Sequence, residues 1–135
     1  MDTFNIILKK GQRFQLTFDR FECKDGEFIL YDDNHYPSEE AYLSFDAVSA
    51  IVPTNQRHSD KIEPFRVYLT NDEHVDVYAH SFDRSQSPSI KFYVRVADNR
   101  PSQELKNIYV AASEVKAITP LEGLRFERKR SLKDD

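Results

Sequence analysis

The sequence has one cysteine, Cys23, no tryptophan and only three glycines among its 135 residues. A single cysteine excludes an intrachain disulfide, so we expect a reducing, cytoplasmic compartment. No apolar run approaches the roughly 20 residues that a membrane helix needs, and we expect no membrane association. At the N-terminus the lysines follow the short apolar run, which is the reverse of the order in a signal peptide.

The net charge of −4 is unevenly distributed along the chain. Residues 1–53 carry 5 basic and 10 acidic groups, residues 54–120 carry 9 of each, and residues 121–135 carry 5 and 4. A protein that grips duplex nucleic acid needs a broad basic surface, because the phosphates supply most of the affinity. The acidic body of this chain argues against duplex binding.

One phrase occurs twice in the chain. AYLSFDAVSAIVP at Ala41–Pro53 is matched by NIYVAASEVKAITP at Asn107–Pro120, and the two final prolines are 67 positions apart. A second pair of similar segments begins at Phe4 and Phe65, 61 positions apart. We assign the six-residue difference between the offsets to a loop, because insertions concentrate in loops. The chain is therefore predicted to contain two copies of one unit.

The predicted units are residues 1–53 and 62–120, with a linker at 54–61 and a charged tail at 121–135. In both units apolar residues alternate with polar ones, which is the period-two pattern of strands that bury one face. The residues that this alternation assigns to the cores are Phe14, Leu16, Phe18, Phe28 and Leu30 in the first unit and Val75, Val77, Ile90, Phe92 and Val94 in the second.

Turn-forming triplets separate the predicted strands, at residues 9–11 (KKG), 24–26 (KDG) and 70–72 (TND). Asp46 and Ser113 match within the repeated phrase, and each is a good cap for a single helical turn before the last strand. Each unit then has five short strands. We predict an all-β protein with two tandem small five-stranded barrels of the SH3-like or Sm-like kind.

A helix is the alternative for residues 3–11. Phe4, Ile7 and Leu8 share one helical face, and Gly11 is suited to end such a helix. We favour a strand, because the matching segment that begins at Phe65 has a strand-like pattern.

Residues 64–83, PFRVYLTNDEHVDVYAHSFD, followed by IYVAASEVKAITP, resemble the Sm-like family, which includes the bacterial RNA chaperone Hfq. The shared features are an apolar strand, a turn, a longer second strand that ends in Ser81-Phe82-Asp83, and a final strand that ends in proline. The likeness covers most of both halves. It implies ring assembly and binding of single-stranded RNA. With two units in each chain, we expect a homo-oligomer in which three copies form a ring of six units.

The sequence departs from the Hfq-like pattern at two places. The lysine–histidine pair expected before the last strand is replaced by Phe45-Asp46 and Ala112-Ser113, and the expected base-stacking aromatic is replaced by Lys24 and Ser85. Stacking and a positive groove are what single-strand binding needs physically. These departures weaken the implied RNA function more than the implied fold.

We nevertheless name an RNA-binding set. The positions that the resemblance provides are Lys24, Phe82, Asp83 and Arg84, and the basic tail adds Arg128, Lys129 and Arg130. An acidic protein surface and bulk solvent are the alternatives for the tail.

No catalytic, metal or cofactor site is predicted. His74 and His80 share a strand face with Asp76, but six residues of extended strand, roughly 20 Å, separate the two histidines. Cys23 has no nearby histidine that would make it a nucleophile. An aromatic cage or a peptide groove is an alternative to ordinary surface positions for Tyr31, Tyr36, Tyr78 and Tyr93.

Two classes of function are consistent with these patterns. The first is a divergent Sm-like assembly protein that contacts single-stranded RNA. The second is an SH3-like protein-interaction or scaffolding module without nucleic acid. We do not expect an enzyme.

Overall fold

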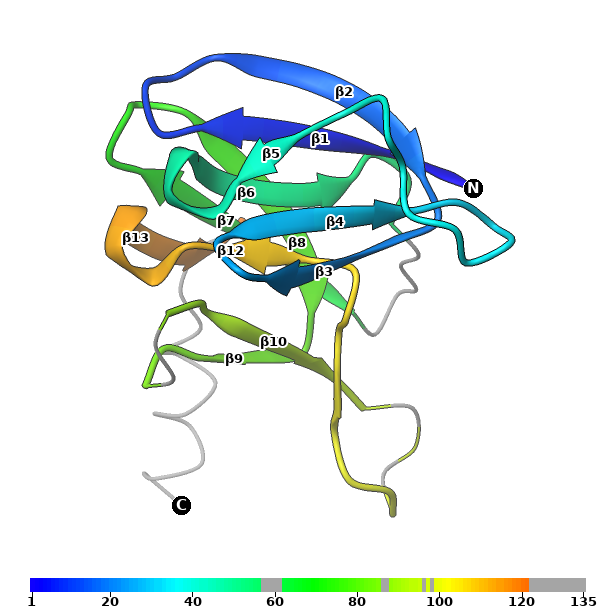
Figure 1. Ribbon diagram of the computed structural model, residues 1–135. Helices are drawn as coiled ribbons and strands as arrows, with labels where there is room; N and C mark the ends of the chain where they lie inside the picture. The colour runs from blue at the N-terminus through cyan, green and yellow to red at the C-terminus, as the bar shows by residue number, and fades with distance from the viewer. Residues whose placement is uncertain (57–61, 86–87, 96, 98, 122–135) are drawn as a thin grey trace, which may run out of the picture.

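The computed structural model describes residues 1–56, 62–85, 88–95, 97 and 99–121, and this part of the chain is all-β (Figure 1). The strands of the first half are β1 (Asp2–Leu8), β2 (Arg13–Phe18), β3 (Arg20–Lys24), β4 (Glu27–Tyr31), β5 (Leu43–Ser44) and β6 (Val48–Pro53). Those of the second half are β7 (Glu63–Leu69), β8 (His74–Ala79), β9 (Ser81–Asp83), β10 (Lys91–Val94), β11 (Gln103–Glu104), β12 (Tyr109–Val110) and β13 (Val115–Pro120). Two single-turn 3-10 helices, η1 (Phe45–Ala47) and η2 (Ala112–Glu114), precede β6 and β13.

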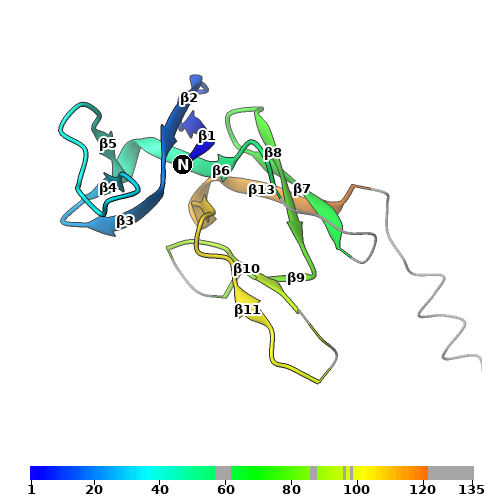
Figure 2. The ribbon, with the colours of Figure 1, turned by 90° about the vertical axis from the view of Figure 1, so that its right-hand side faces the viewer.

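The strands form four small antiparallel sheets, and none of them closes on itself within the described residues. The orders are β12-β6-β1-β2, β3-β4-β5, β13-β7-β8 and β11-β10-β9. Figure 2 shows the sheet β3-β4-β5 on the far side of β1 and β2 from β7 and β8. The first sheet is notable because β12, a strand of the second half, lies at the edge of a sheet built from the first half.

Backbone hydrogen bonds of the first half recur in the second at the two sequence offsets. Lys9 N–H donates to the Ala47 carbonyl at 2.8 Å, and Thr70 N–H donates to that of Glu114 at 2.9 Å. The same bulge also recurs, because the register slips between Ile7 and Leu8 where β1 meets β6 and between Val115 and Ala117 where β13 meets β7. The extra residue is Ser49 in β6 and Lys116 in β13, which are 67 positions apart.

The predicted turns are present. Asp25 and Gly26 have φ of 53° and 80° between β3 and β4, as a two-residue hairpin turn requires. Gly11 (φ 102°) and Asp72 (φ 70°) hold matching positions after β1 and β7. The helix considered for residues 3–11 is wrong, because β1 occupies most of this segment.

Two details of the predicted units are also wrong. The first half has six strands rather than five, since the chain bends at Asp19 and divides the long second strand into β2 and β3. The second half has seven, because its longer connection before β12 carries β11. Asp46 and Ser113 lie inside η1 and η2, and neither turn has a side-chain cap hydrogen bond.

The core prediction is confirmed for seven of the ten residues. Phe18, Phe28, Leu30, Val75, Val77, Ile90 and Phe92 are buried, and the other three, Phe14, Leu16 and Val94, are only partly buried. Phe14 and Leu16 lie on β2, which is an edge strand of its sheet and is covered less completely.

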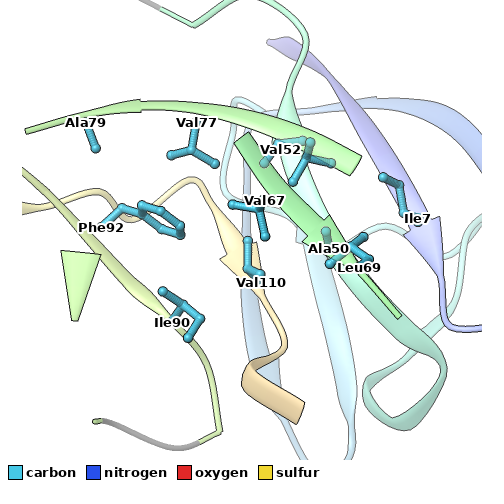
Figure 3. Packing of buried hydrophobic residues seen from close by; sticks show 11 residues of the cluster. Ile7, Ala50, Val52, Val67, Leu69, Val77, Ala79, Ile90, Phe92 and Val110 are labelled. Atoms are coloured by element: carbon cyan, nitrogen blue, oxygen red, sulfur yellow. The ribbon is translucent and has the colours of Figure 1, made fainter. Parts of the chain in front are cut away.

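Both hydrophobic clusters draw residues from the two halves. Ile7, Ala50 and Val52 of the first half pack with Val67, Leu69 and other residues of the second (Figure 3). The other cluster surrounds Phe4, Phe18 and Phe28 and includes Tyr109 and Ala111 from the second half. The halves therefore share their cores.

Candidate functional site

The joint between the halves is a strand pair. Tyr109 and Val110 of β12 lie opposite Ile51 and Ala50 of β6, and Ala111 N–H donates to the Ser49 carbonyl at 2.9 Å. β6 pairs with β1 on one edge, and β12 covers its other edge. All six residues of β6 are buried. An edge strand with unpaired main-chain groups accepts another strand readily.

A single aromatic side chain anchors this joint. The ring of Tyr109 lies with its centroid 4.7 Å from that of Phe28 and 5.6 Å from that of Phe45, and the side chain is 7% exposed. Burial raises the pKa of Tyr109 to about 12, with smaller contributions from negative charge on Cys23, Asp46 and Glu114. The second half therefore inserts the aromatic side chain of Tyr109 between apolar side chains of the first half.

The second half has a related cavity along the outer edge of β13. Its volume is about 300 Å³, and it is lined by Phe82, Arg84, Ile90, Ala112 and residues 115–118. At the two offsets, Phe82 matches Phe21, and Ala112 matches Phe45. Ser89 lies opposite Ala111 just as Glu27 lies opposite Ser44 in the first half. The next residue in each strand therefore matches, so Ile90 takes the place of Phe28.

The edge beside this cavity is free. β13 pairs with β7 on one side only, and no described strand pairs with its other side. Every residue of β13 is at least partly exposed, whereas every residue of the matching β6 is buried. The difference follows from β12, which covers β6 and has no counterpart on β13.

The first half also has an unpaired strand edge among the described strands, at β5. β5 corresponds to the inserting strand of the joint, whereas β13 corresponds to the receiving strand. β5 matches the end of β12, and among the described strands it pairs only with β4, through Leu43 opposite Phe28. Tyr42 precedes it and matches Tyr109 at the 67-residue offset, but Tyr42 is 68% exposed. Tyr42 is not among the site residues predicted from the sequence. The repeat was a usable signal, because it aligns Tyr42 with Tyr109.

The structure does not gather the predicted RNA-binding residues into one site. Lys24 is exposed at the end of β3, whereas Arg84 is exposed after β9 in the other half. The Phe82 ring is partly buried against Phe65, with centroids 5.3 Å apart, and its remaining surface lines the cavity at β13. Asp83 accepts a hydrogen bond from Ser85 N–H at 2.8 Å. Arg128, Lys129 and Arg130 lie outside the described residues.

Asp76 and His80, which were considered with His74 as metal ligands, form hydrogen bonds with neighbouring residues. Arg66 donates two hydrogen bonds to Asp76, at 2.8 and 3.0 Å, and this pairing raises the pKa of Arg66. His80 Nδ1 accepts a hydrogen bond from Arg95 N–H at 2.8 Å. Among the residues that the structure describes, no group of three or more His, Cys, Asp or Glu side chains is placed to hold a metal ion.

One of the surface tyrosines, Tyr31, takes part in a polar cluster on β3 and β4. Tyr31 donates a hydrogen bond to Glu22 at 3.0 Å, and the Arg20 guanidinium lies 3.9 Å from the centre of its ring. The hydrogen bonds from Tyr31 and Arg20 lower the pKa of Glu22, and Glu22 raises the pKa of Tyr31. Tyr31 is thus engaged within its own sheet rather than in an aromatic cage.

No protein-family model matches the chain, and neither a curated protein nor a solved structure matches it. In the described part of the chain, no helix is long and apolar enough to cross a membrane.

Proposed function

We propose that the protein is a non-enzymatic assembly protein built from two tandem Sm-like barrels, and that it binds a protein segment by strand addition along β13. The observation that carries the proposal is the cavity beside the unpaired edge of β13, whose lining combines apolar side chains with Arg84 and Lys116. Main-chain hydrogen bonds supply affinity in this mode of binding, and a side-chain pocket supplies specificity. The joint between β12 and β6 is an example of the same arrangement within the chain.

In the proposed barrels, the strands of the four sheets form two units. Sheets β6-β1-β2 and β3-β4-β5 belong to the first unit, and the bent β2–β3 segment connects them. The bend is supported by Asp19 N–H, which donates to the Tyr31 carbonyl at 2.8 Å, and His80 N–H donates to that of Tyr93 at the matching bend. A strand that turns from one sheet into the next is typical of small barrels.

The preferred ligand is an extended segment with one aromatic side chain. A cavity of about 300 Å³ is large enough to take an aromatic ring, and Phe82, Ile90 and Ala112 supply apolar surface within its mixed polar and apolar lining. Arg84 at the same cavity favours an acidic residue beside the aromatic one, whereas Lys116 is already paired with Asp72 at 2.9 Å.

Short extended peptides test this proposal by fluorescence polarisation. Peptides with a central tyrosine should bind, and the same peptides with alanine at that position should bind at least about tenfold more weakly. Ala112→Arg fills the cavity and should abolish binding, whereas Ala47→Arg, the same change in η1, should leave it unchanged. Equal binding of the tyrosine and alanine peptides would contradict the proposal.

Contact with single-stranded RNA is the second candidate function. Lys24 and Arg84 favour it, because both are exposed and neither forms an ion pair within the described residues. Filter binding with short single-stranded RNAs at two salt concentrations tests it, since phosphate contacts weaken as salt rises. Retention that falls with salt, and falls again in a Lys24→Glu, Arg84→Glu variant, would support RNA binding.

A further inference from the structure

The two halves of the chain offer complementary edges to the outside. The first half presents β5 and the exposed Tyr42, and the second half presents β13 and its cavity. At the internal joint, β12 and Tyr109 take the place that corresponds to β5 and Tyr42, and β6 takes the place that corresponds to β13. We infer that the segment bound at β13 is Tyr42–Ser44 of a second copy of this chain, with Tyr42 in the cavity. The inference rests on the proposed strand addition and specifies its partner.

The internal joint fixes the expected register. Tyr109 lies opposite Ile51 and Val110 opposite Ala50, so Tyr42 should lie opposite Ile118 and Leu43 opposite Ala117 of the neighbouring chain. The Ser49 carbonyl accepts a hydrogen bond from Ala111, so the Lys116 carbonyl should accept one from Ser44. β13 can form this ladder because it keeps the bulge of β6.

The cavity has room for the incoming ring. The ring of Tyr109 packs against the rings of Phe28 and Phe45, which also contact each other with centroids 5.5 Å apart. The smaller Ile90 and Ala112 stand at the matching positions of the second half and line the cavity of about 300 Å³. A cavity of about 310 Å³ also lies beside Phe28, Phe45 and Tyr109 in the internal joint. Insertion of Tyr42 would bury a large side chain that is 68% exposed in the free chain.

Charge is complementary across the expected contact. Glu39 and Glu40 are exposed just before Tyr42, and Arg84 is exposed at the cavity and forms no ion pair within the described residues. Lys116 is also exposed there, but it pairs with Asp72 at 2.9 Å. Opposite charges at the two edges accelerate association and disfavour contact between like edges. The contact should therefore weaken as salt increases.

The contact between chains should be weaker than the internal joint. Asn71 donates a hydrogen bond to the Leu8 carbonyl at 2.8 Å beside the internal joint, but the residue that matches Asn71 in the first half is Lys10. The internal joint also benefits from the covalent connection of the halves, which raises the effective concentration. We expect reversible association at micromolar concentrations.

Light scattering across a dilution series measures this association. Wild type should exceed its monomer mass of 15.8 kDa, and Tyr42→Ala and Ala112→Arg should each stay at 15.8 kDa. Tyr36→Ala is the matched control, since Tyr36 is also 68% exposed, and it should behave as wild type. Circular dichroism and thermal melts establish that each variant is folded.

A mixture of the two disabled variants gives the sharpest test. Tyr42→Ala keeps the cavity and Ala112→Arg keeps the tyrosine, so the equimolar mixture should form a heterodimer of about 32 kDa, twice 15.8 kDa. A mixture that stays at 15.8 kDa would overturn the inference, as would a wild type that remains monomeric throughout the dilution series.

A disulfide trap does not depend on the folding of the Ala112 variant. In a Cys23→Ser background, Ser44→Cys combined with Lys116→Cys should give covalent multimers on non-reducing gels, and neither single substitution should give more than a dimer. If no multimers form but tyrosine peptides still bind at β13, only the self-association fails. If the peptides also fail to bind, the proposed function fails with it.

Discussion

The ring of Tyr109 lies 4.7 Å from the ring of Phe28, centroid to centroid, and so joins the second half of the chain to the first. The matching tyrosine, Tyr42, is exposed. One residue type in one repeated phrase therefore has two environments, and the difference lies in whether a neighbouring unit covers it.

Tyr109→Ala should lower the free energy of unfolding by about 3–5 kcal/mol, as expected for loss of a large buried aromatic side chain. Chemical denaturation measures the loss. Tyr42→Ala is the matched control and should change the stability of the monomer by less than about 0.5 kcal/mol, because its ring is exposed. Similar losses in the two variants would contradict the assignment of Tyr109 as the anchor.

Ser49→Ala should stabilise the protein. Ser49 is fully buried in β6, and its hydroxyl has no hydrogen-bond partner in the part of the chain that the structure describes. Leaving a buried hydroxyl unsatisfied costs about 1–3 kcal/mol, so its removal should raise the melting temperature by a few degrees. A lower melting temperature in calorimetry would show that this hydroxyl has a partner.

Stability at high pH should depend on Tyr109. Its pKa is raised from 10.0 to about 12 in the folded state, so the unfolded chain loses this proton first. The contribution of Tyr109 is then constant below pH 10 and is lost as the pH rises from 10 towards 12. The pKa difference corresponds to about 3 kcal/mol at most. Tyr109→Phe should remove this part of the pH dependence, which denaturation on both sides of pH 10 would detect.

A closed oligomer should contain three chains. Head-to-tail contacts form a ring when the rotation between units closes and a filament when it does not. If the outer contact repeats the internal joint and six units close the ring, the mass is about 47 kDa, three times 15.8 kDa. Sedimentation that reaches a plateau at this mass supports closure, whereas a mass that grows steadily with concentration indicates a filament.

Deletion of the tail from Arg125 onward should leave the melting temperature nearly unchanged. The tail is densely charged, and its apolar residues do not form a continuous face in the sequence. The prediction lies outside the described residues and rests on composition alone. A fall of more than about 5 °C, which corresponds to about 1 kcal/mol, would show that the tail is structural.

Alternation and turn chemistry were sufficient to predict the all-β class. β8 shows why, since its apolar residues Val75, Val77 and Ala79 are buried while the residues between them are more exposed. The same method could not find β6 as the most buried strand. Its residues have no polar face, and a strand buried on both faces loses the period-two signal.

The candidate site was less predictable. Phe82 was assigned to RNA by resemblance, but its ring packs towards Phe65 and Phe92. The alternation of single strands could not show that β12 crosses to the other half, because a strand's partner is decided by tertiary contacts. For this reason the sequence aligned Tyr42 with Tyr109 without showing that only one of them is covered.

The shared cores determine how the chain unfolds. One hydrophobic cluster contains Ile7 and Ala50 with Val67, and the other contains Phe4 with Tyr109 and Ala111. Removal of either half would strip both clusters of buried residues. The two halves should therefore melt in one cooperative transition, as a single folding unit rather than as two independently stable modules.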